Sequence, residues 1–484
     1  MTPEGNTEQM FVGGRWVTPS GGERFDVISP WTQERIGSVA LASAADAEAA
    51  LQAARTAFDD GGWTALSPGE RARYVSAIAD GLEVRLGRSG VALTTEMGKP
   101  IVAAQRGNEY AVAMARDFAR MGETLSTDEQ REVPGGTSHI LREPVGVVLA
   151  FIPWNSPHPL AVNKLAPALI AGCTVVVKMA PEAPFNTSIL AEAIEAAGLP
   201  PGVINVLTAG SEVSAYMVNS PLVDKISFTG SLEVGQSILR ASAARLTRVT
   251  LELGGKSAAI VLDDVDFDRT VPELLRASLN SSGQACRALT RFLVPQQRHA
   301  EFMDALLAYV AQVPVGDPFE KDTVVGPLVS ARQRERVESY IEIARAEGAH
   351  LAYGGGRPPQ LDHGWFVEPT IFDGVAPKMR IAQEEVFGPV ISVLTYQDDN
   401  EAVSVANDSI YGLSGAVFTE DVARGEAIAR RVRAGTFNVG RVGISMLQPF
   451  GGYRCSGLGR EGGPEGFDAY LETKQLYVPV PLVS

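Results

Sequence analysis

An α/β fold built on parallel sheets is predicted by the alternation of short apolar runs with helical patterns along this 484-residue chain. The runs recur at regular intervals after residue 144, and they are Val145 to Ile152, Thr174 to Lys178, Val203 to Leu207, Lys225 to Phe228 and Arg248 to Glu252. Parallel strands need crossover connections, so this alternation indicates βαβ units with helices on both faces of a sheet. The length adds an expectation of roughly two to four domains.

Helix signals dominate the chain before the first of these runs. Ser43 with Asp46, and the segment Ser67-Pro68-Gly69-Glu70, have the composition of capping positions that open amphipathic helices. Between Thr127 and Arg142 the apolar periodicity lapses, and Pro134-Gly135-Gly136 is typical of a turn. We therefore expect a protruding hairpin or loop there, as an excursion from the domain.

A second alternation begins after Ser257. It runs through Ala258 to Leu262, a helix around Leu274, a polar loop with Cys286, and Arg291 to Val294, which predicts a further α/β domain. The final segment, Tyr470 to Ser484, has the proline-containing composition of an edge strand that pairs with another element or subunit.

Composition excludes several classes of function. The net charge of −15, with 45% hydrophobic and 20% charged residues, leaves no electrostatic footprint for nucleic acid or anionic membranes. Glu4 and Glu8 stand where a signal peptide would be basic, and the apolar stretch Leu165 to Val177 is shorter than the ~20 residues of a spanning helix. Three cysteines cannot all pair, so we expect free thiols and a cytoplasmic enzyme.

Polar residues gather at the carboxyl ends of the predicted strands, where open α/β sheets form their ligand crevice: Asn155, Lys178, Gly210, Ser231 and Glu252. The segment Gly230 to Gly235 follows a strand and opens a helix, so it is either an ordinary helix cap or a phosphate site. Lys178 at a buried strand end needs an anionic or hydroxyl-rich partner, and a nucleotide ribose or phosphate would serve.

Cys286 and Glu252 supply a thiol nucleophile and a base. A lone cysteine is more often buried packing, as Cys173 appears in its apolar run, but Cys286 lies past Gly283 in a polar loop that suits catalysis. Glu252 is either a ligand of backbone amides or a base with an environment-tuned pKa. Asn155 is either a turn residue or an oxyanion donor, with the Cys286 N–H as the second donor.

Two other patterns predict no further chemistry. Gly457 to Gly462 matches GxGxxG, but no strand clearly precedes it and 22 residues remain, too few for a βαβ unit. The five histidines show no clustered ligand spacing, so no metal is expected.

The chain resembles the NAD(P)-dependent aldehyde dehydrogenase family over essentially its whole length. The segments that carry the resemblance occur in the family's order: Pro153-Trp154-Asn155-Ser156-Pro157, Phe228-Thr229-Gly230-Ser231, Leu251-Glu252-Leu253-Gly254-Gly255-Lys256, Gly283-Gln284-Ala285-Cys286, Glu384-Glu385-Val386-Phe387-Gly388-Pro389, and Pro449-Phe450-Gly451-Gly452 through Gly463.

The resemblance implies that Cys286 attacks an aldehyde, that Asn155 and the Cys286 amide hold the oxyanion, and that Glu252 activates the water that hydrolyses the thioester. It implies NAD as cofactor, with NADP possible because Pro181 stands where a ribose-binding glutamate is common. The implied cofactor contacts are Ile152, Trp154, Lys178, Gly210, Gly230, Ser231, Val234, Leu253, Glu385 and Phe387, with Glu385 on the nicotinamide ribose.

The resemblance also implies three domains and a homodimer or homotetramer. The nucleotide-binding domain would comprise residues 1–122 and 144–255, the catalytic domain 256–452, and a small β bridging domain 123–143 and 470–484. An exposed strand pair in the bridging domain would extend sheets between subunits.

Three further positions depart from the family pattern. Arg287, directly after the nucleophile, is bulkier and more polar than usual and is predicted to line the pocket. Ser156 stands where an aromatic residue often follows the asparagine, and Gly440 replaces an asparagine that commonly follows the segment Gly435 to Val439. Two alternatives stay open: a CoA-acylating aldehyde dehydrogenase, which Glu252 disfavours because transfer to a thiolate needs no base, and a silent binding or structural protein on the same scaffold.

Overall fold

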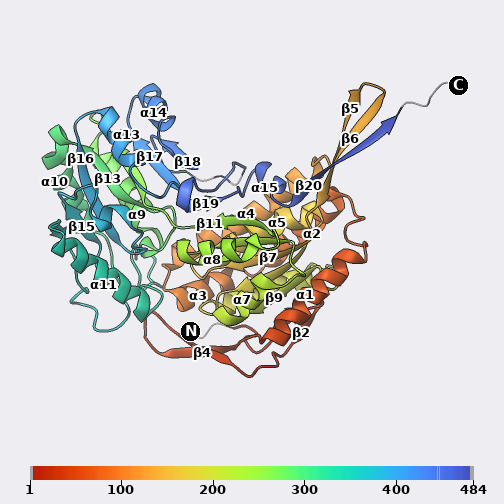
Figure 1. Cartoon of the computed structure of the whole chain (residues 1–484). Coiled ribbons are helices and arrows are strands. Elements are labelled where there is room, and N and C mark those ends of the chain that lie inside the picture. The colour runs from red at the N-terminus through yellow and green to blue at the C-terminus, as the bar shows by residue number, and fades with distance from the viewer. Residues whose placement is uncertain (1–3, 444, 446, 480–484) are drawn as a thin grey trace.

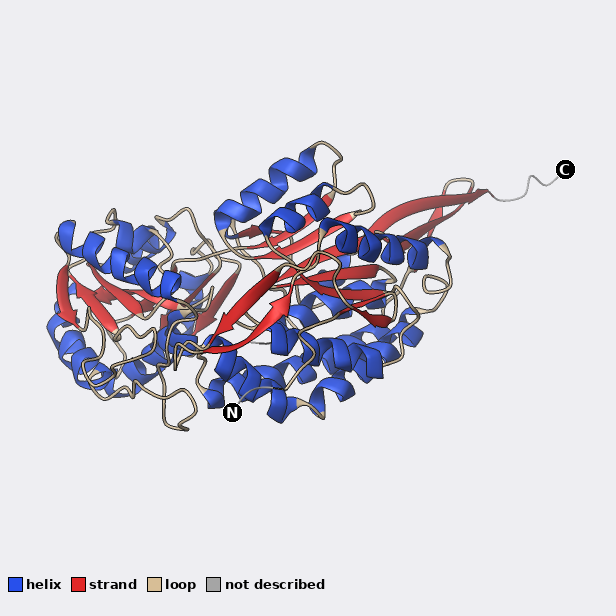
Figure 2. Ribbon diagram, turned by 90° about the horizontal axis from the view of Figure 1, so that it is seen from below, coloured by secondary structure: helices blue, strands red, loops and turns tan. Residues whose placement is uncertain are grey.

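The larger of two central sheets has eight strands in the order β19-β11-β10-β7-β8-β9-β1-β2. The computed structural model, which describes residues 4–443, 445 and 447–479, places this sheet beside the second one (Figures 1 and 2). Its parallel centre consists of β7 (Val147–Ile152), β8 (Thr174–Met179), β9 (Ile204–Thr208), β10 (Lys225–Thr229) and β11 (Arg248–Glu252). These strands coincide with the five predicted apolar runs, which confirms the predicted fold class.

Alternate side chains of the central strands enter two different cores. Val148 and Ala150 pack with α2 (Pro68–Glu83), α4 (Ile101–Glu123), α5 (Pro157–Ala171) and α6 (Pro184–Ala196). Leu149 and Phe151 pack on the opposite face with α1 (Ala44–Asp59), α7 (Ser211–Asn219) and α8 (Leu232–Ala243). Both faces are therefore covered, which explains why the strands are continuously apolar.

The predicted helix starts at Ser43 and Ser67 are confirmed. Each serine is the N-cap of its helix and forms a reciprocal capping box, with Asp46 in α1 and with Glu70 in α2. α3 (Leu86–Met97) lies between α2 and α4 in the chain. Four short strands precede α1, namely β1 (Met10–Val12), β2 (Arg15–Val17), β3 (Arg24–Ile28) and β4 (Arg35–Ala40).

The second sheet has seven strands in the order β14-β15-β16-β13-β12-β17-β18. Its strands are β12 (Ser257–Val261), β13 (Leu289–Pro295), β14 (His350–Tyr353), β15 (Thr370–Asp373), β16 (Val390–Tyr396), β17 (Ser414–Phe418) and β18 (Thr436–Val439). The helices of this part are α9 (Phe267–Leu279), α10 (His299–Val310), α11 (Ala331–Ala346), α12 (Arg380–Gln383), α13 (Asp399–Asn407) and α14 (Val422–Ala429). The predicted second α/β unit is thus present, with β12, α9 and β13 in the expected order.

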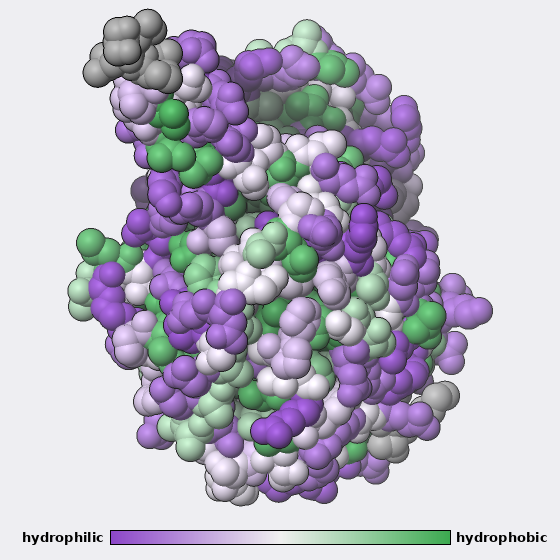
Figure 3. All heavy atoms as spheres, turned by 90° about the vertical axis from the view of Figure 1, so that its right-hand side faces the viewer, coloured by the Kyte–Doolittle hydropathy of each residue, from purple (hydrophilic) through white to green (hydrophobic). Residues whose placement is uncertain are grey.

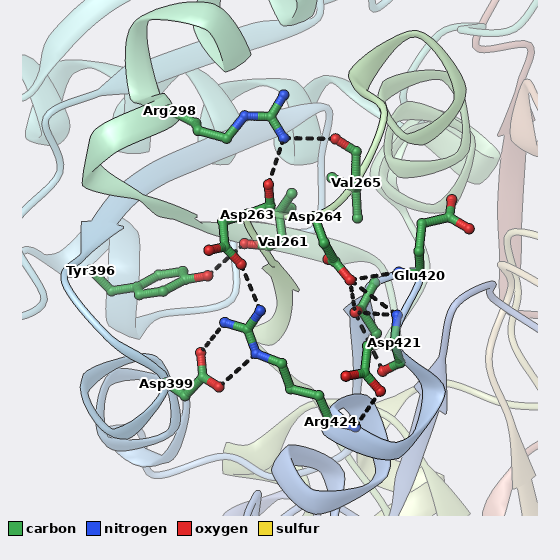
Figure 4. A network of polar contacts seen from close by, with 11 residues as sticks. Val261, Asp263, Asp264, Val265, Arg298, Tyr396, Asp399, Glu420, Asp421 and Arg424 are labelled. Atoms are coloured by element: carbon green, nitrogen blue, oxygen red, sulfur yellow. Dashed lines mark hydrogen bonds and ion pairs between the residues drawn. The ribbon is translucent and has the colours of Figure 1, made fainter.

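An ion-pair network ties the carboxyl end of β12 to two helices of this second unit (Figure 4). The Arg424 guanidinium contacts Asp263 at 2.6 Å and Asp399 at 2.8 Å, and Asp264 accepts hydrogen bonds from the backbone of Glu420 and Asp421. The network joins the loop after β12 to the first turns of α13 and α14.

Three antiparallel strands form an arm that projects from the body (Figure 1). They are β5 (Asp128–Val133), β6 (Gly136–Pro144) and β20 (Leu471–Pro479), in the order β20-β6-β5. The predicted turn at Pro134-Gly135 joins β5 to β6, which confirms the protruding hairpin. β20 pairs with β6, which confirms that the final segment pairs with another element. Residues 480–484 of that segment lie outside the described residues. Polar and apolar side chains mix over the face of the molecule seen from the arm's side (Figure 3).

The Gly457 to Gly462 segment forms no βαβ unit. β19 (Gly457–Leu458) adds to β11 as a short antiparallel strand, and only the four-residue α15 (Glu465–Asp468) follows before β20. No helix among the described residues is long and apolar enough to cross a membrane. The exact residue limits of the three predicted domains stay a prediction.

Candidate active site

One cavity of about 1250 Å³ is lined by the carboxyl ends of strands of the larger sheet, by α4, and by α9, α11 and loops of the second unit. Asn155, Glu252 and Cys286, the three predicted catalytic residues, all line it. Six of the predicted cofactor contacts line the same cavity: Trp154, Gly230, Ser231, Leu253, Glu385 and Phe387. Residues that are up to 233 positions apart, from Trp154 to Phe387, therefore meet at the carboxyl edge of the larger sheet.

Asn155 lies in the loop between β7 and α5. The proline at position 157 occupies the first turn of α5, so the helix begins directly after this loop. The Asn155 Nδ2 donates a hydrogen bond to the Gln284 carbonyl at 3.1 Å. A carboxamide nitrogen carries two N–H groups, so one remains for a ligand while the other holds Asn155 against the cysteine loop.

The cysteine loop is tightly constrained. After α9, Ser281 and Ser282 have φ values of 54° and 58°, and Gly283 has φ 75°. A Cβ on Gly283 would lie 2.2 Å from the Gly388 carbonyl oxygen, so only glycine fits there. Strained backbone of this kind persists where surrounding structure fixes it, and here it presents Cys286 to the cavity.

Cys286 is a half-buried free thiol. Burial raises the pKa of the thiol to about 12, and the carboxylates of Glu385 and Glu252 add to the effect, while Arg287 opposes it. The thiol is therefore protonated at neutral pH in the unliganded protein. A base must remove this proton before the sulfur can attack a carbonyl.

Glu252, the last residue of β11, is a buried carboxyl group, and neither of its oxygens has a hydrogen-bond partner among the described residues. Burial raises the pKa of Glu252 well above its ordinary range, and the nearby Glu461 raises it further. A carboxyl group with a raised pKa is a stronger base than an ordinary one. Water or substrate that enters the cavity can supply the missing hydrogen bonds.

Glu461 was missed by sequence reasoning, although it lies within the GxGxxG segment. It forms a buried ion pair with Lys164 of α5 and accepts a hydrogen bond from the Asn163 Nδ2 at 2.7 Å. The available signal was Lys164 itself, because a lysine inside an apolar helix needs an anionic partner. The pair is 297 residues apart in sequence, so no local pattern identifies Glu461 as that partner.

Glu385 reaches the cavity from the second unit. Its Oε1 accepts a hydrogen bond from the Gly255 N–H at 3.2 Å, and burial raises the pKa of its carboxyl group to about 7. A Cβ on Gly254 would lie 2.1 Å from the Glu385 Oε2, so a side chain there would displace the carboxylate. Phe387 and Trp154 make an edge-to-face contact with ring centroids 5.7 Å apart across the cavity.

Four predicted cofactor contacts do not line the cavity. Ile152 is buried at the end of β7, and Lys178 lies in β8, where burial lowers the pKa of its ammonium group. Gly210 caps α7, and Val234 is 48% exposed in the first turn of α8, where its N–H donates to the Ser231 Oγ at 3.4 Å. Their contact with a cofactor stays a prediction.

The far wall of the cavity contains residues that sequence reasoning did not select. Most of them come from the loop before α4 and from α4 itself: Lys99, Pro100, Val102, Ala103, Arg106, Gly107, Tyr110 and Met114. Arg287 and Ser156, two departures from the family pattern, also line the cavity, as predicted for Arg287. Gly440 does not line the cavity, and its φ of 77° is one that glycine adopts freely.

A thiol, a buried carboxyl group and a carboxamide thus line one cavity at the edge of a parallel sheet, which is where α/β enzymes form their active sites. The model of the aldehyde dehydrogenase family matches residues 16–476. The chain belongs to this family, whose members oxidise aldehydes to carboxylic acids with NAD(P)+, and it is an aldehyde dehydrogenase.

The relatives and solved structures agree with this assignment. The chain is 43% identical to geranial dehydrogenase of Castellaniella defragrans over 97% of this chain and 98% of that one. It is 38% identical to betaine aldehyde dehydrogenase of Bacillus subtilis, with 97% of each chain covered. A crystal structure of a Mycobacterium tuberculosis aldehyde dehydrogenase complexed with NAD+ matches with a TM-score of 0.95 and 42% identity, over 99% of each chain. The predictions of family, fold class and enzyme class are confirmed.

Proposed function

We propose that the chain oxidises its aldehyde through a thiohemiacetal and a thioester on Cys286, and that water activated by Glu252 hydrolyses the thioester. The observation that carries this proposal is the single cavity on which the thiol, the buried carboxyl group and the Asn155 carboxamide converge. Each group is of the type that one step of the reaction needs.

NAD+ is the proposed hydride acceptor. The residues present fit a nicotinamide dinucleotide: Gly230 and Ser231 line the cavity where α8 begins, and the positive end of a helix suits a phosphate. The Glu385 carboxylate is placed to accept hydrogen bonds from ribose hydroxyls, and Gly254 leaves the space for this carboxylate. Ile152, Lys178, Gly210 and Val234 are proposed as more distant contacts. The choice of NAD over NADP stays a prediction.

Acylation begins with loss of the Cys286 proton to water that enters the cavity, so the carboxylate of Glu252 stays free for the second half of the reaction. The thiolate forms a bond to the carbonyl carbon, and the carbonyl oxygen becomes an oxyanion. The free Asn155 N–H and the Cys286 backbone N–H donate hydrogen bonds to this oxyanion. Loss of hydride from the same carbon restores the C=O bond and leaves a thioester.

Deacylation needs a base because water is a weak nucleophile. Glu252 removes a proton from water, the oxygen attacks the thioester carbon, and the Cys286 sulfur leaves and is protonated again. The products are a carboxylic acid and the free thiol. This role of Glu252 is also what favours hydrolysis over transfer of the acyl group to CoA.

The test is an aldehyde panel with NAD+ or NADP+, read by absorbance of the reduced nucleotide, with and without CoA. Stoichiometric carboxylic acid in the absence of CoA supports the proposal. Acyl-CoA that forms faster than the acid would favour the CoA-acylating alternative, and failure to bind either nucleotide would favour a silent scaffold.

Assembly, location and domain limits are also proposed. β20 lies at the edge of the arm sheet, and Leu476, Tyr477 and Val478 are each 45–46% exposed on it. An exposed edge strand of this kind suits sheet extension in a homodimer or homotetramer. The bridging domain would comprise residues 123–143 and 470–484. The proposed location is the cytoplasm, because three free cysteines suit a reducing compartment.

A further inference from the structure

Two cationic side chains, Lys99 and Arg287, line the same cavity as the proposed catalytic residues, and we call them the cation pair. Lys99 stands between α3 and α4, is only 5% exposed, and donates a hydrogen bond to the Ser156 Oγ at 3.3 Å. Ser156 follows the proposed oxyanion donor, and Arg287 follows the proposed nucleophile. The cation pair is therefore held next to the loops that carry these two groups.

No carboxylate neutralises the cation pair within the part of the chain that the structure describes. Arg287 has no hydrogen bond or ion pair there, and the partner of Lys99 is a neutral hydroxyl group. Burial, followed by the charge of Arg287, lowers the pKa of Lys99 to about 8, so the ammonium group is still mostly charged at neutral pH. Buried charges without a partner are costly and are normally paired.

The surroundings of the cation pair add positive charge. α4 begins at Ile101, directly after Lys99 and Pro100, and no side chain caps this helix start. The Ile101 N–H donates to the Pro318 carbonyl at 2.8 Å, and the positive end of the helix dipole lies where Val102 and Ala103 line the cavity. Arg106 lines the cavity one turn further along α4 and forms no ion pair among the described residues.

The carboxylates of the cavity do not compensate this charge. Glu252 and Glu385 serve the proposed base and ribose roles, and Glu384 is paired with Arg380. Glu182, Glu233 and Asp322 also line the cavity, but none of them forms an ion pair with Lys99 or Arg287 among the described residues, and the charge of Glu182 acts on Lys178. The wall therefore presents two cations whose counter-charge must come from a ligand.

We propose that the substrate is an aldehyde that carries a carboxylate, which the cation pair binds while the carbonyl group lies at Cys286. This inference rests on the proposed function of Cys286. An arginine fork matches a carboxylate in two parallel hydrogen bonds, and a lysine adds a point charge. Because Arg287 is adjacent to Cys286 and neighbouring Cα atoms are about 3.8 Å apart, the chain between aldehyde and carboxylate is short, about four to six carbons in all.

The same wall disfavours a cationic substrate. A quaternary ammonium group in this position would face Lys99 and Arg287. Repulsion between like charges held close together would weaken the binding of such a substrate. The chain would therefore differ in substrate charge preference from relatives that are named as betaine aldehyde dehydrogenases.

The test compares kcat/KM for three aldehydes of matched chain length at saturating NAD+: succinate semialdehyde, butanal and trimethylammoniobutanal. We expect the wild-type protein to prefer the carboxylate-bearing aldehyde to butanal by at least about tenfold, the loss expected for one charge-assisted hydrogen bond. The Arg287→Gln variant should lower this ratio by about tenfold. Arg269→Gln is the matched control, because Arg269 is an exposed arginine of the same unit, whose ion pair with Glu420 spans 3.5 Å and which does not line the cavity.

Equal kcat/KM for succinate semialdehyde and butanal, or a ratio that Arg287→Gln leaves unchanged, would overturn the inference. Oxidation of none of the three aldehydes would instead contradict the proposed function. If Arg287→Gln does not fold, inhibition of the wild-type protein decides: succinate should compete with butanal, and neutral succinamide should not. Inhibition by both compounds to the same extent would also overturn the inference.

Discussion

Replacing Glu252 with glutamine should separate acylation from deacylation. Glutamine has nearly the same shape as glutamate, and neither carboxyl oxygen has a hydrogen-bond partner that the change would remove among the described residues. Glutamine cannot accept a proton from water, so the thioester should form and then persist. The variant should therefore fold as well as the wild-type protein and fail at one step.

The expected magnitude follows from the role of a general base. Such a base contributes about 10²–10⁴-fold to a rate, which corresponds to about 2.7–5.4 kcal/mol of activation free energy. Rapid mixing of Glu252→Gln with NAD+ and an oxidised substrate should give a burst of about one NADH per active site. The steady-state rate after the burst should fall by the factor above.

The stability of the same variant provides a second readout. The folded-state pKa of Glu252 lies above its unfolded-state value, so the folded protein binds more protons in between. The free energy of unfolding therefore falls as pH rises through this window, and glutamine does not titrate. The melting temperature of Glu252→Gln should exceed that of the wild-type protein by more at about pH 8 than at about pH 5.

Glu96→Gln is the matched control, because Glu96 is also a buried glutamate with a raised pKa but does not line the cavity. Its oxygens accept hydrogen bonds from the Phe185 N–H and the Asn186 Nδ2. We expect this control to lose stability and to keep the wild-type kinetics. A Glu252→Gln protein with an unchanged steady-state rate would refute the assignment of the base, and absence of any burst would place Glu252 in acylation instead.

Three further predictions follow from the site. Cys286→Ala should abolish turnover and leave the Kd for NAD+, measured by calorimetry, unchanged, because the thiol is not a nucleotide contact; residual turnover would refute its role. In the wild-type protein, kcat should rise with pH in a range well above that of an ordinary glutamate, because the carboxyl group of Glu252 has a raised pKa and must be deprotonated, and this rise should be absent in Glu252→Gln. Gly254→Ala should raise KM for NAD+ by about tenfold, since its Cβ would lie 2.1 Å from the Glu385 Oε2, whereas Gly316→Ala, with nothing within 4 Å, should not.

Local patterns were sufficient to predict the crevice. Each central strand is a short apolar run, and its carboxyl end is where the polarity changes, so Asn155 and Glu252 could be placed at one edge of one sheet. The cysteine loop was predictable for the same reason, because Gly283 and a polar segment interrupt the apolar pattern between α9 and β13. The turn at Pro134-Gly135 was identified by turn chemistry alone.

Long-range contacts were not predictable from these patterns. The Lys164 to Glu461 ion pair, the Gly254 to Glu385 contact and the approach of α4 to Cys286 each join residues more than 100 positions apart. Periodicity reports whether a residue is buried, but not which charge lies opposite. The electrostatic environment of Glu252, and the unpaired charges of Lys99 and Arg287, therefore required the folded chain.

The most direct test of the central claim is mass spectrometry of the acyl enzyme. Glu252→Gln would be mixed with NAD+ and an oxidised aldehyde, quenched with acid within the burst, and digested. The peptide that contains Cys286 should gain the mass of the acyl group, in an amount equal to the NADH burst, while the peptides of Cys173 and Cys455 should remain unmodified. NADH formation with an unmodified Cys286 peptide, or an acyl group on another cysteine, would contradict the mechanism.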